Sequence, residues 1–404
     1  GSAKSCHDGN VCTTDNCDKS KGCIHSNNSV ACDDGNLCTS GDICAGGGCQ
    51  GGSPKSCDDG NGCTTDNCVK SKGCVHTNNG AGCDDGNLCT SGDTCAGGAC
   101  QSGPVKSCDD GKVCSAGTCD QKSGQCKFAA VSAGTSCGGQ GKCASSACVW
   151  TAAQGRKMVY VPAGPFWMGC NSAKDKACTG SEKPQHEVVL SAYWIDTYQV
   201  TVSDWGKCKT AGKCGVPKGT HSNCNWGKVG REQHPINCVD WAQARGFCYW
   251  LGGEYDLPTE AQWEKAARGG CEHNGGYSGC ASGMRTYPWG ETSPSCDLAV
   301  FDPDGNSKGC GQDSTWAVGL KPKGVTPYGC HNMAGNVWEW IADSWDSEFY
   351  LKSPKNDPLN NQKSAVRGFR GGSYVHSAAW LRSSFRNATS SSNASWAMGF
   401  RCVR

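Results

Sequence analysis

Cysteine is the residue type that carries most of the potential chemistry of this chain, with 36 copies among 404 residues. The N-terminal cysteines recur with a period of 51, so that the eight from Cys6 to Cys49 return as the eight from Cys57 to Cys100. A third and less regular copy begins at Cys108. Thiols at regular spacing either form disulfides in an oxidising compartment or hold a metal ion.

The spacing favours disulfides over metal. The chain has no Cys-x-x-Cys pair and no Cys-x-x-Cys-His segment, which disfavours zinc ribbons and covalent c-type haem. Histidine recurs at equivalent positions only as His25 and His76. Asp-Asp-Gly-Asn segments at 33–36, 58–61 and 84–87 offer oxygen atoms to calcium. An Asx turn with glycine at positive φ explains the same residues, and we favour the turn.

The segment that carries these cysteines cannot bury a conventional core, because it lacks Leu, Ile and Phe at regular spacing. Ordering entropy of about 1–2 kcal/mol per residue would leave it disordered without disulfides, each of which offsets about 2–4 kcal/mol. We predict an elongated stalk in which repeats contact only their neighbours. Its units are 1–51, 52–102 and a degenerate 103–150. Each unit holds two sub-repeats, and the four cysteines of a complete sub-repeat allow three pairings, which the sequence leaves open.

Residues 151–404 have the composition of a globular domain, with 14 of the 15 Trp and every Arg and Glu of the chain. An apolar run at 188–190 predicts a strand, and apolar residues at helical spacing predict a helix after Asp240. Thr259 begins a capping box ahead of a second helix, which ends at Gly269. Little regular periodicity follows. We therefore predict an α+β domain with a high loop content.

Eight motifs in this second part are more specific than its periodicity. In chain order they are VYVPAGPFWMGC (159–170), EKPQHEVVLSAYWIDTYQVT (182–201), HPINCVDWAQARGFCYW (234–250), LPTEAQWEKAARGG (257–270), YPWG (287–290), YGCHNMAGNVWEW (328–340), VRGFRGGSY (366–374) and GFRC (399–402). Together they closely resemble the formylglycine-generating enzyme, or sulfatase-modifying factor, family. This resemblance implies a loop-rich variant of the C-type lectin fold over residues 158–402.

The first part of the chain resembles a second family. Its pattern CDDGNxCTxDxC…GCxH is similar to the cysteine-rich repeat of slime-mould extracellular matrix proteins, which is also met in surface proteins of myxobacteria-like organisms. The similarity covers nearly all of residues 6–126. It implies a role as a matrix component, stalk or adhesin and brings no catalytic residues with it.

The first resemblance raises the question of copper. Enzymes of the family oxidise a substrate cysteine with copper(I) held by two cysteines that follow a Gly-Gly-Ser motif, and soft thiolates suit copper(I). The motif matches residues 371–373, but His376 and Leu381 occupy the two cysteine positions. We therefore expect no copper and no catalytic residues. A related branch of iron-dependent sulfoxide synthases takes histidine ligands from an added helical domain, and nothing like that domain precedes residue 158.

The same resemblance implies calcium. The family holds one ion in a loop with an asparagine, two backbone carbonyls and a glutamate, which are ligands that suit calcium. The matching positions are Asn332, the carbonyls of Gly335 and Val337, and the carboxylate of Glu339. A tight turn closed without metal would explain the same residues. A second family site would use Asp297 and the carbonyl of Leu298, but its distant aspartate has no clear match here.

The resemblance also implies a disulfide between Cys248 and Cys402, and it locates the face that would hold the active site. That face combines aromatic and small polar side chains, a composition typical of adaptable binding surfaces. Variable receptor proteins with this fold place their diversified ligand contacts in the same C-terminal stretch. The face comprises Trp338, Ser373, Tyr374, His376, Trp380, Phe385 and Trp396. A lone imidazole such as that of His376 is more typical of a pocket residue than of a metal ligand.

Charge and composition exclude other classes of function. The net charge is +1, and no cluster of Lys and Arg provides a surface for nucleic acid or anionic membranes. No apolar run reaches the length of about 18 residues expected of a membrane-spanning helix. We expect a secreted protein at the cell surface or in a matrix, with any signal peptide already removed. Odd cysteine counts before and after residue 150 require either a bridge between the two parts or two thiols left for other partners.

Three hypotheses for function remain open. The first is a structural or adhesive extracellular protein whose disulfide-rich stalk carries a non-catalytic lectin-like head, with self-association into a filament or contacts to other surface proteins and glycans. The second is a soluble receptor whose head binds a peptide or glycan. The third is a copper- or iron-dependent oxidase of the formylglycine-generating family.

Overall fold

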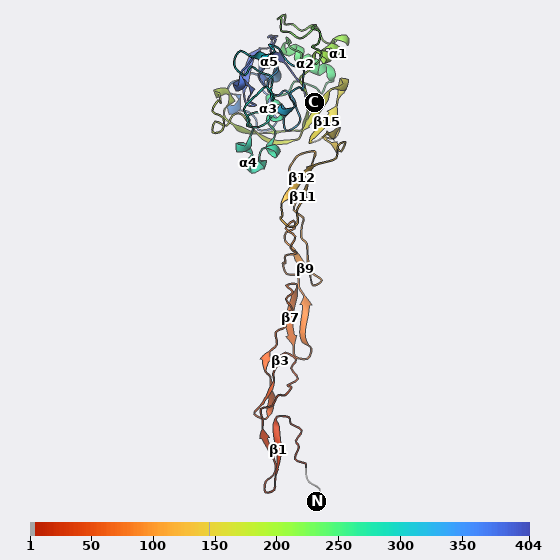
Figure 1. Cartoon of the computed structure of the whole chain (residues 1–404), viewed down its shortest axis with the longest axis vertical. Coiled ribbons are helices and arrows are strands. Elements are labelled where there is room, and N and C mark those ends of the chain that lie inside the picture. The colour runs from red at the N-terminus through yellow and green to blue at the C-terminus, as the bar shows by residue number, and fades with distance from the viewer. Residues whose placement is uncertain (1–4, 145) are drawn as a thin grey trace. The chain divides into compact units, whose positions relative to one another are not determined.

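The computed structural model describes residues 5–144 and 146–404 as two compact units. The first unit contains the residues up to 108 together with 118–127, and the second contains 109–117 and 128–404. Figure 1 shows the contrast between the short hairpins of the first unit and the larger mixed domain of the second. None of the helices in the described part of the chain is both long and apolar enough to cross a membrane.

The repeats fold as short antiparallel hairpins, with β1 pairing with β2, β4 with β5, β7 with β8, β9 with β10, and β11 with β12, while β3 pairs with β6. The strands are β1 Thr13–Asp18, β2 Gly22–Asn27, β3 Thr39–Ser40, β4 Ile43–Ala45, β5 Gly48–Gln50, β6 Ser53–Pro54, β7 Thr64–Val69, β8 Gly73–Asn78, β9 Thr94–Ala96, β10 Ala99–Gln101, β11 Ser115–Cys119 and β12 Cys126–Ala130. The Asp-Asp-Gly-Asn segments form the predicted Asx turns. In the first of them the Asp33 carboxylate accepts the N–H of Gly35 at 2.8 Å, and Gly35 has a φ of +71°.

The disulfides of the repeats follow one rule. The first and fourth cysteines of each sub-repeat pair with each other, and the second cysteine pairs with the third cysteine of the next sub-repeat. The pairs within a sub-repeat are Cys6–Cys23, Cys32–Cys49, Cys57–Cys74, Cys83–Cys100, Cys108–Cys126 and Cys137–Cys148. The pairs between successive sub-repeats are Cys12–Cys44, Cys38–Cys68, Cys63–Cys95, Cys89–Cys119 and Cys114–Cys143.

The remaining bridges are Cys170–Cys178, Cys208–Cys214, Cys224–Cys238, Cys248–Cys402, Cys271–Cys280 and Cys296–Cys310. In the described part of the chain, no disulfide joins a cysteine before residue 150 to one after it. Two thiols stay free instead, the exposed Cys17 and the buried Cys330. This resolves the odd counts of the two parts.

The described residues of the second unit form three small sheets and five helices. The sheets have the orders β13-β14-β15-β16-β19, β17-β18 and β22-β21-β20-β23. Their strands are β13 Ser136–Cys137, β14 Gly141–Ala144, β15 Ala147–Thr151, β16 Lys157–Val161, β17 Gly164–Met168, β18 His186–Leu190, β19 Tyr193–Asp196, β20 Trp338–Ser344, β21 Val366–Arg370, β22 Arg386–Ser390 and β23 Met398–Gly399. The five-stranded sheet continues across residue 150, because Val149 of β15 pairs with Val159 of β16.

The helices are α1 Val202–Thr210, α2 Trp241–Leu251, α3 Glu260–Arg268, α4 Gly276–Gly283 and the single turn α5 Lys308–Gly311. The short 3₁₀ turns are η1 Ala153–Gly155, η2 Gly180–Glu182, η3 Cys271–His273, η4 Pro322–Gly324, η5 Phe349–Leu351 and η6 Ala378–Leu381. Both predicted helices are confirmed with their caps. Asp240 accepts the N–H of Gln243, and Thr259 accepts that of Gln262. These elements confirm a loop-rich α+β domain after a disulfide-rich repeat segment.

The core around α3 contains charges as well as apolar side chains. Trp263 and Trp340 are fully buried, and so is Arg370. Arg370 lies 3.0 Å from the Glu260 carboxylate and 2.5 Å from that of Glu264. Buried charges are costly unless they are paired and hydrogen-bonded, so this network fixes the position of β21 relative to α3.

Candidate functional site

The loop after β21 carries the Gly-Gly-Ser motif and begins with two residues that require glycine. Gly371 and Gly372 have φ values of +98° and +76°. A Cβ on Gly372 would lie 2.7 Å from Cδ2 of Leu381, so the loop turns directly against that leucine. The N–H of Tyr374 then bonds to the carbonyl of Asn336 at 2.9 Å, which ties the loop to the segment before β20.

Ser373 and His376 form a hydrogen-bonded pair in this loop. The Ser373 Oγ lies 2.6 Å from Nδ1 of His376, and the tautomer of the ring decides which atom donates. Ser373 is fully buried and His376 is half-buried. Burial lowers the pKa of His376 from its ordinary value, so the ring is neutral at pH 7.

Leu381 is part of the core and not of an open site. Its side chain is fully buried in an apolar cluster with Ala299, Phe301 and Ala334. The two positions at which the family resemblance implies copper-binding cysteines carry a neutral imidazole and a buried isobutyl group. Of the two free thiols, Cys330 is buried, and burial raises the pKa of its thiol to about 11. The residues at this loop do not fit copper(I), which needs soft thiolate ligands.

Aromatic rings surround His376. We call the set of Trp338, Phe369, His376, Trp380 and Phe385 the aromatic cluster. The centroid of the Trp338 ring lies 5.2 Å from that of His376 and 4.9 Å from that of Phe369, in edge-on geometry. Trp380 lies 5.0 Å from His376 and 4.9 Å from Phe385. Such spacings add about 0.5–1.5 kcal/mol per pair to the gain from burial.

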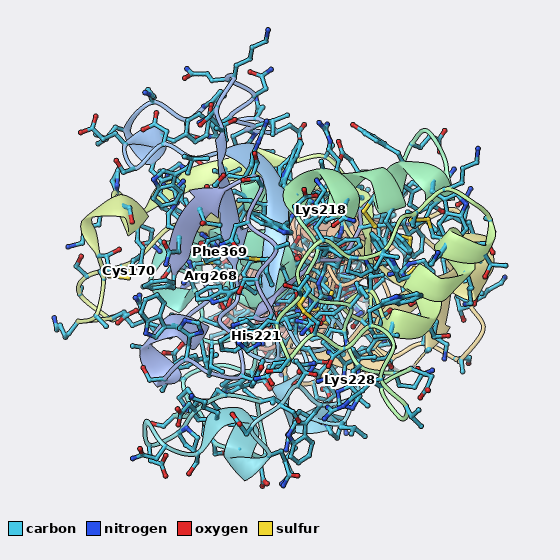
Figure 2. All side chains as sticks on the ribbon, turned by 90° about the horizontal axis from the view of Figure 1, so that it is seen from above. Cys170, Lys218, His221, Lys228, Arg268 and Phe369 are labelled. Atoms are coloured by element: carbon cyan, nitrogen blue, oxygen red, sulfur yellow. A yellow bond between two sulfur atoms is a disulfide. The ribbon has the colours of Figure 1, made fainter. Side chains whose placement is uncertain are left out.

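The structure divides the predicted ligand face into two groups. The first group lies in the aromatic cluster. Tyr374 and Trp396 form the second group, with ring centroids 5.6 Å apart. His221, which the sequence did not single out, stacks on Trp396 at 5.0 Å. Figure 2 labels Phe369 of the aromatic cluster and His221 of the second group.

Only part of the predicted face reaches solvent. Trp338, Ser373 and Tyr374 are buried, with 3%, 0% and 0% of their surface exposed. Trp380, Phe385 and Trp396, like His376, are half-buried. The buried members position the half-buried ones, and the accessible surface is neutral and largely aromatic.

Three of the four predicted calcium ligands, the carbonyls of Gly335 and Val337 and the Glu339 carboxylate, converge on the side-chain amide of Gln199. Asn332 contributes its backbone carbonyl instead of its side chain, because its Oδ1 accepts the N–H of Gly319 at 2.9 Å. The Gln199 Nε2 is 2.9 Å from Oε1 of Glu339, and 3.2, 3.4 and 3.1 Å from the carbonyl oxygens of Asn332, Gly335 and Val337. An amide nitrogen has two hydrogens and cannot satisfy four acceptors fully. The oxygen set fits calcium in chemistry, but the ion would require the Gln199 amide to move aside.

Two further residues complete this oxygen cluster. The Arg401 guanidinium contacts both carboxylate oxygens of Glu339, at 2.7 and 2.8 Å. The indole N–H of Trp263 donates to Glu339 Oε2 at 2.8 Å. Gln199 and Arg401 lie inside the YQVT and GFRC ends of two quoted motifs, but no spacing rule connects these segments to residues 332–339. Sequence reasoning therefore missed both.

The second predicted calcium position has different surroundings. The Asp297 carboxylate is 74% exposed and lies 3.1 Å from the amine of Lys323. The carbonyl of Leu298 is packed against Gly324, where a Cβ would come within 1.8 Å of its oxygen. Cys296, the residue before Asp297, is bonded to Cys310.

The comparisons with known proteins agree with this geometry. Residues 146–404 match the sequence profile of the sulfatase-modifying factor enzyme 1-like domain. The chain belongs to this family. Residues 5–28 and 56–79 match the Dictyostelium (slime mold) repeat. Both resemblances inferred from the motifs are thereby confirmed.

Relatives within the sulfatase-modifying factor family carry the names of enzymes. The formylglycine-generating enzyme of Streptomyces coelicolor is 35% identical over 198 residues, which cover 46% of this chain and 56% of the relative. The hercynine oxygenase of Mycolicibacterium smegmatis is 26% identical over 267 residues, covering 57% of this chain and 56% of the relative. The chain thus spans about half the length of these curated relatives.

The fold itself has a solved counterpart. The structure of PvdO from Pseudomonas aeruginosa superposes with a TM-score of 0.53 at 25% sequence identity, over 63% of this chain and 97% of the other. Together with the family match over residues 146–404, this similarity shows a C-type-lectin-like fold for the C-terminal domain.

Proposed function

We propose that this member of the sulfatase-modifying factor family is an extracellular surface or matrix protein whose C-terminal domain binds a ligand instead of oxidising cysteine. The observation that carries the proposal is the replacement of both copper-binding positions, one by the hydrogen-bonded His376 and the other by Leu381 inside the core. Seventeen disulfides support a location outside the reducing cytosol.

The chemistry of the accessible surface defines the ligand class. His376 is neutral, and its half-buried neighbours Trp380 and Phe385 present ring faces and edges without a charge. Aromatic side chains offer large contact area at low entropic cost, because only two torsions are fixed on binding. We therefore expect a neutral ligand, either a glycan or an uncharged peptide segment, carried by another surface molecule.

The direct test is a binding screen of the full chain against glycan and peptide arrays. The double variant Trp380→Ala/Phe385→Ala should reduce binding at least tenfold while the near-ultraviolet circular dichroism of the fold is kept. Tyr249→Ala removes an exposed aromatic ring (46%) on α2, outside the aromatic cluster, and serves as the control. Absence of any ligand from both arrays, or equal binding by the double variant, would contradict the proposal.

The enzymatic alternative is tested separately, because the relatives are named as oxidising enzymes. The full chain is incubated with copper(I), oxygen and a cysteine-containing sulfatase peptide, and the peptide mass is followed. We expect no aldehyde. Turnover of the peptide that is lost in His376→Ala would overturn the assignment of a binding domain.

The same proposal includes self-association or contact with other surface proteins through the repeats. Negative-stain electron microscopy of the secreted protein, with a non-reducing gel alongside, distinguishes a polymer from single molecules. Filaments or ladders indicate a polymer. Single particles on the grid and a single band on the gel leave the C-terminal domain as a receptor without an assembled scaffold.

A further inference from the structure

In the disulfide pattern of the repeats, one sub-repeat has a third cysteine without a partner. The third cysteine of a sub-repeat pairs with the second cysteine of the sub-repeat before it, as in Cys38–Cys68 and Cys89–Cys119. Cys17 is the third cysteine of the first sub-repeat, and its thiol is free and exposed. It stands 51 residues before Cys68, in the same place of the period.

The junction at Cys68 shows what fills such a position. Besides the disulfide to Cys38, the backbone N–H of Leu37 donates to the carbonyl of Lys70 at 3.0 Å. The Cβ of Leu37 also lies 3.7 Å from the point where a Cβ on Gly73 would be. One covalent bond, one backbone hydrogen bond and one apolar contact therefore define the junction.

The junction at Cys119 repeats the same three contacts. Cys89 supplies the disulfide, and the N–H of Leu88 donates to the carbonyl of Gln121 at 3.0 Å. The Leu88 Cβ lies 3.1 Å from the position of a Cβ on Gly124. Two copies of the junction in one molecule show that the contacts belong to the repeat and not to one local sequence.

The first sub-repeat presents this surface without a partner. Its hairpin has the same register, with Cys17 opposite Cys23 as Cys68 is opposite Cys74. Among the described residues, no backbone N–H donates to the carbonyl of Lys19, and nothing lies within 4 Å of the Cβ position on Gly22. The thiol, the carbonyl and the open glycine are the three groups that both other junctions engage.

We propose that this surface, formed by Cys17, Lys19 and Gly22, is a covalent docking site for the second sub-repeat of another unit of the same class. That partner carries a Cys-Asp-Asp-Gly-Asn-Leu-Cys segment, with its leucine over Gly22 and its second cysteine bonded to Cys17. The partner lies outside residues 1–404. Within this chain Cys38 and Cys89 are already bonded, and the sixth sub-repeat has no cysteine between Cys137 and Cys143.

The bond forms by thiol–disulfide exchange. The two thiols of Cys17 and the partner lose two protons and two electrons as their sulfurs join. A small-molecule disulfide such as oxidised glutathione accepts them and leaves as two thiols. The series of bridges between sub-repeats ends at the sixth sub-repeat, which lacks the second cysteine. Further units are therefore linked by this type of bridge only at the Cys17 side of the repeats.

The test lengthens the full protein by one unit. Residues 5–55 are copied ahead of residue 5, which places the copied Cys38 30 residues before Cys17, the separation found for Cys38–Cys68. The extended chain is expressed through an oxidising secretory route, and its bridges are mapped by mass spectrometry of a non-reduced digest. We expect a bridge between the copied Cys38 and the original Cys17. The number of free thiols should stay at two, the copied Cys17 and Cys330.

The matched control is the same extended chain with the original Cys17→Ser, which should raise the count of free thiols to three by exposing the copied Cys38. An extended chain with four free thiols, or with Cys17 bonded to any other cysteine, overturns the proposal. This result is independent of ligand binding by the C-terminal domain, because the screen on the aromatic cluster uses the chain without the extension.

Discussion

Arg401 and Glu339 form a paired contact in the core of the C-terminal domain, with Nε 2.7 Å from Oε2 and Nη2 2.8 Å from Oε1. Both side chains are fully buried. Loss of one partner of such a pair costs about 3–5 kcal/mol, because the other charge is left uncompensated. In this pair the Arg401 guanidinium is a cation of the chain itself that contacts the carboxylate predicted to bind calcium.

The first prediction concerns calcium at this loop. Gln199→Ala removes the amide that now lies among the four oxygens, so calcium should raise the thermal midpoint of this variant more than that of the parent protein. In EDTA the variant should be the less stable of the two, because three buried carbonyls lose the amide that donates to them and Glu339 loses one of its donors. Differential scanning calorimetry with and without calcium gives both numbers.

Glu339→Gln provides the control for calcium. It removes the one carboxylate of the set and should abolish the calcium response, with a loss of stability from the unpaired Arg401. If calcium shifts the thermal midpoint of neither the parent protein nor Gln199→Ala, the loop is a tight turn closed without metal.

The second prediction concerns the disulfide Cys248–Cys402, whose cysteines are 154 residues apart in sequence. By chain entropy alone its removal as Cys248→Ala/Cys402→Ala should cost about 5 kcal/mol, against about 2 kcal/mol for the six-residue separation of Cys208–Cys214. Guanidinium unfolding followed by tryptophan fluorescence compares the two double variants. Equal losses would show that packing of the buried sulfurs, and not loop length, sets the cost.

The third prediction concerns the pH dependence of stability through Asp343 of β20. Burial, together with repulsion from Glu260, raises the pKa of Asp343 to about 7. The folded state thus holds a proton more tightly than the unfolded state, whose carboxyl titrates at its usual low value. The contribution of this group to stability is therefore present at acid pH and is lost as the pH rises from about 4 to about 7.

The measurement is the difference in unfolding free energy between the parent protein and Asp343→Asn across pH 4–8. His234 and His273 give stability the opposite pH dependence, because burial lowers the pKa of each to about 4. Both histidines are present in the parent and in the variant, so their contribution cancels in the difference. The parent should lose stability relative to the variant as the pH rises. A flat difference would mean that the backbone N–H groups of Glu260 and Asn360 hold Asp343 ionised throughout.

The fourth prediction concerns the Gly-Gly-Ser loop. Gly371→Ala should destabilise the domain by about 1–3 kcal/mol, since φ is +98° and the new Cβ would lie 3.0 Å from the Trp263 ring. Gly253→Ala, at a position with nothing within 4 Å and no positive φ, is the control and should be close to neutral. Chemical denaturation at neutral pH measures the unfolding free energy of both variants and of the parent protein. A neutral Gly371→Ala would show that the loop shifts without cost.

Much of the fold was predictable from local patterns. The 51-residue period predicted the repeats, and the caps at Asp240 and Thr259 located two helices, because both signals depend on residues close in sequence. The family motifs indicated the lectin-like domain before any packing was known. The Asx turns were likewise readable from four adjacent residues.

The candidate site was predictable only in part. Its aromatic residues were identified by resemblance, but their burial was not. Tyr374 and Ser373 are enclosed, while Trp380 and Phe385 remain accessible. His221 was missed because its contact with Trp396 joins segments that no periodicity relates.

The sequence by itself determined the 51-residue cysteine-rich repeats and, through the family motifs, the sulfatase-modifying factor domain. The resemblance to that family implies that His376 and Leu381 stand where its enzymes have copper-binding cysteines. The Cys248–Cys402 bridge, which the family resemblance implied, is confirmed.

Only the tertiary structure decided how the cysteines of the repeats pair and that Cys17 is left over. It also placed Gln199 and Arg401 at Glu339. The physical reason is that pairing, burial and ion contacts depend on the distance between atoms, and residues far apart in the chain become neighbours only when it folds.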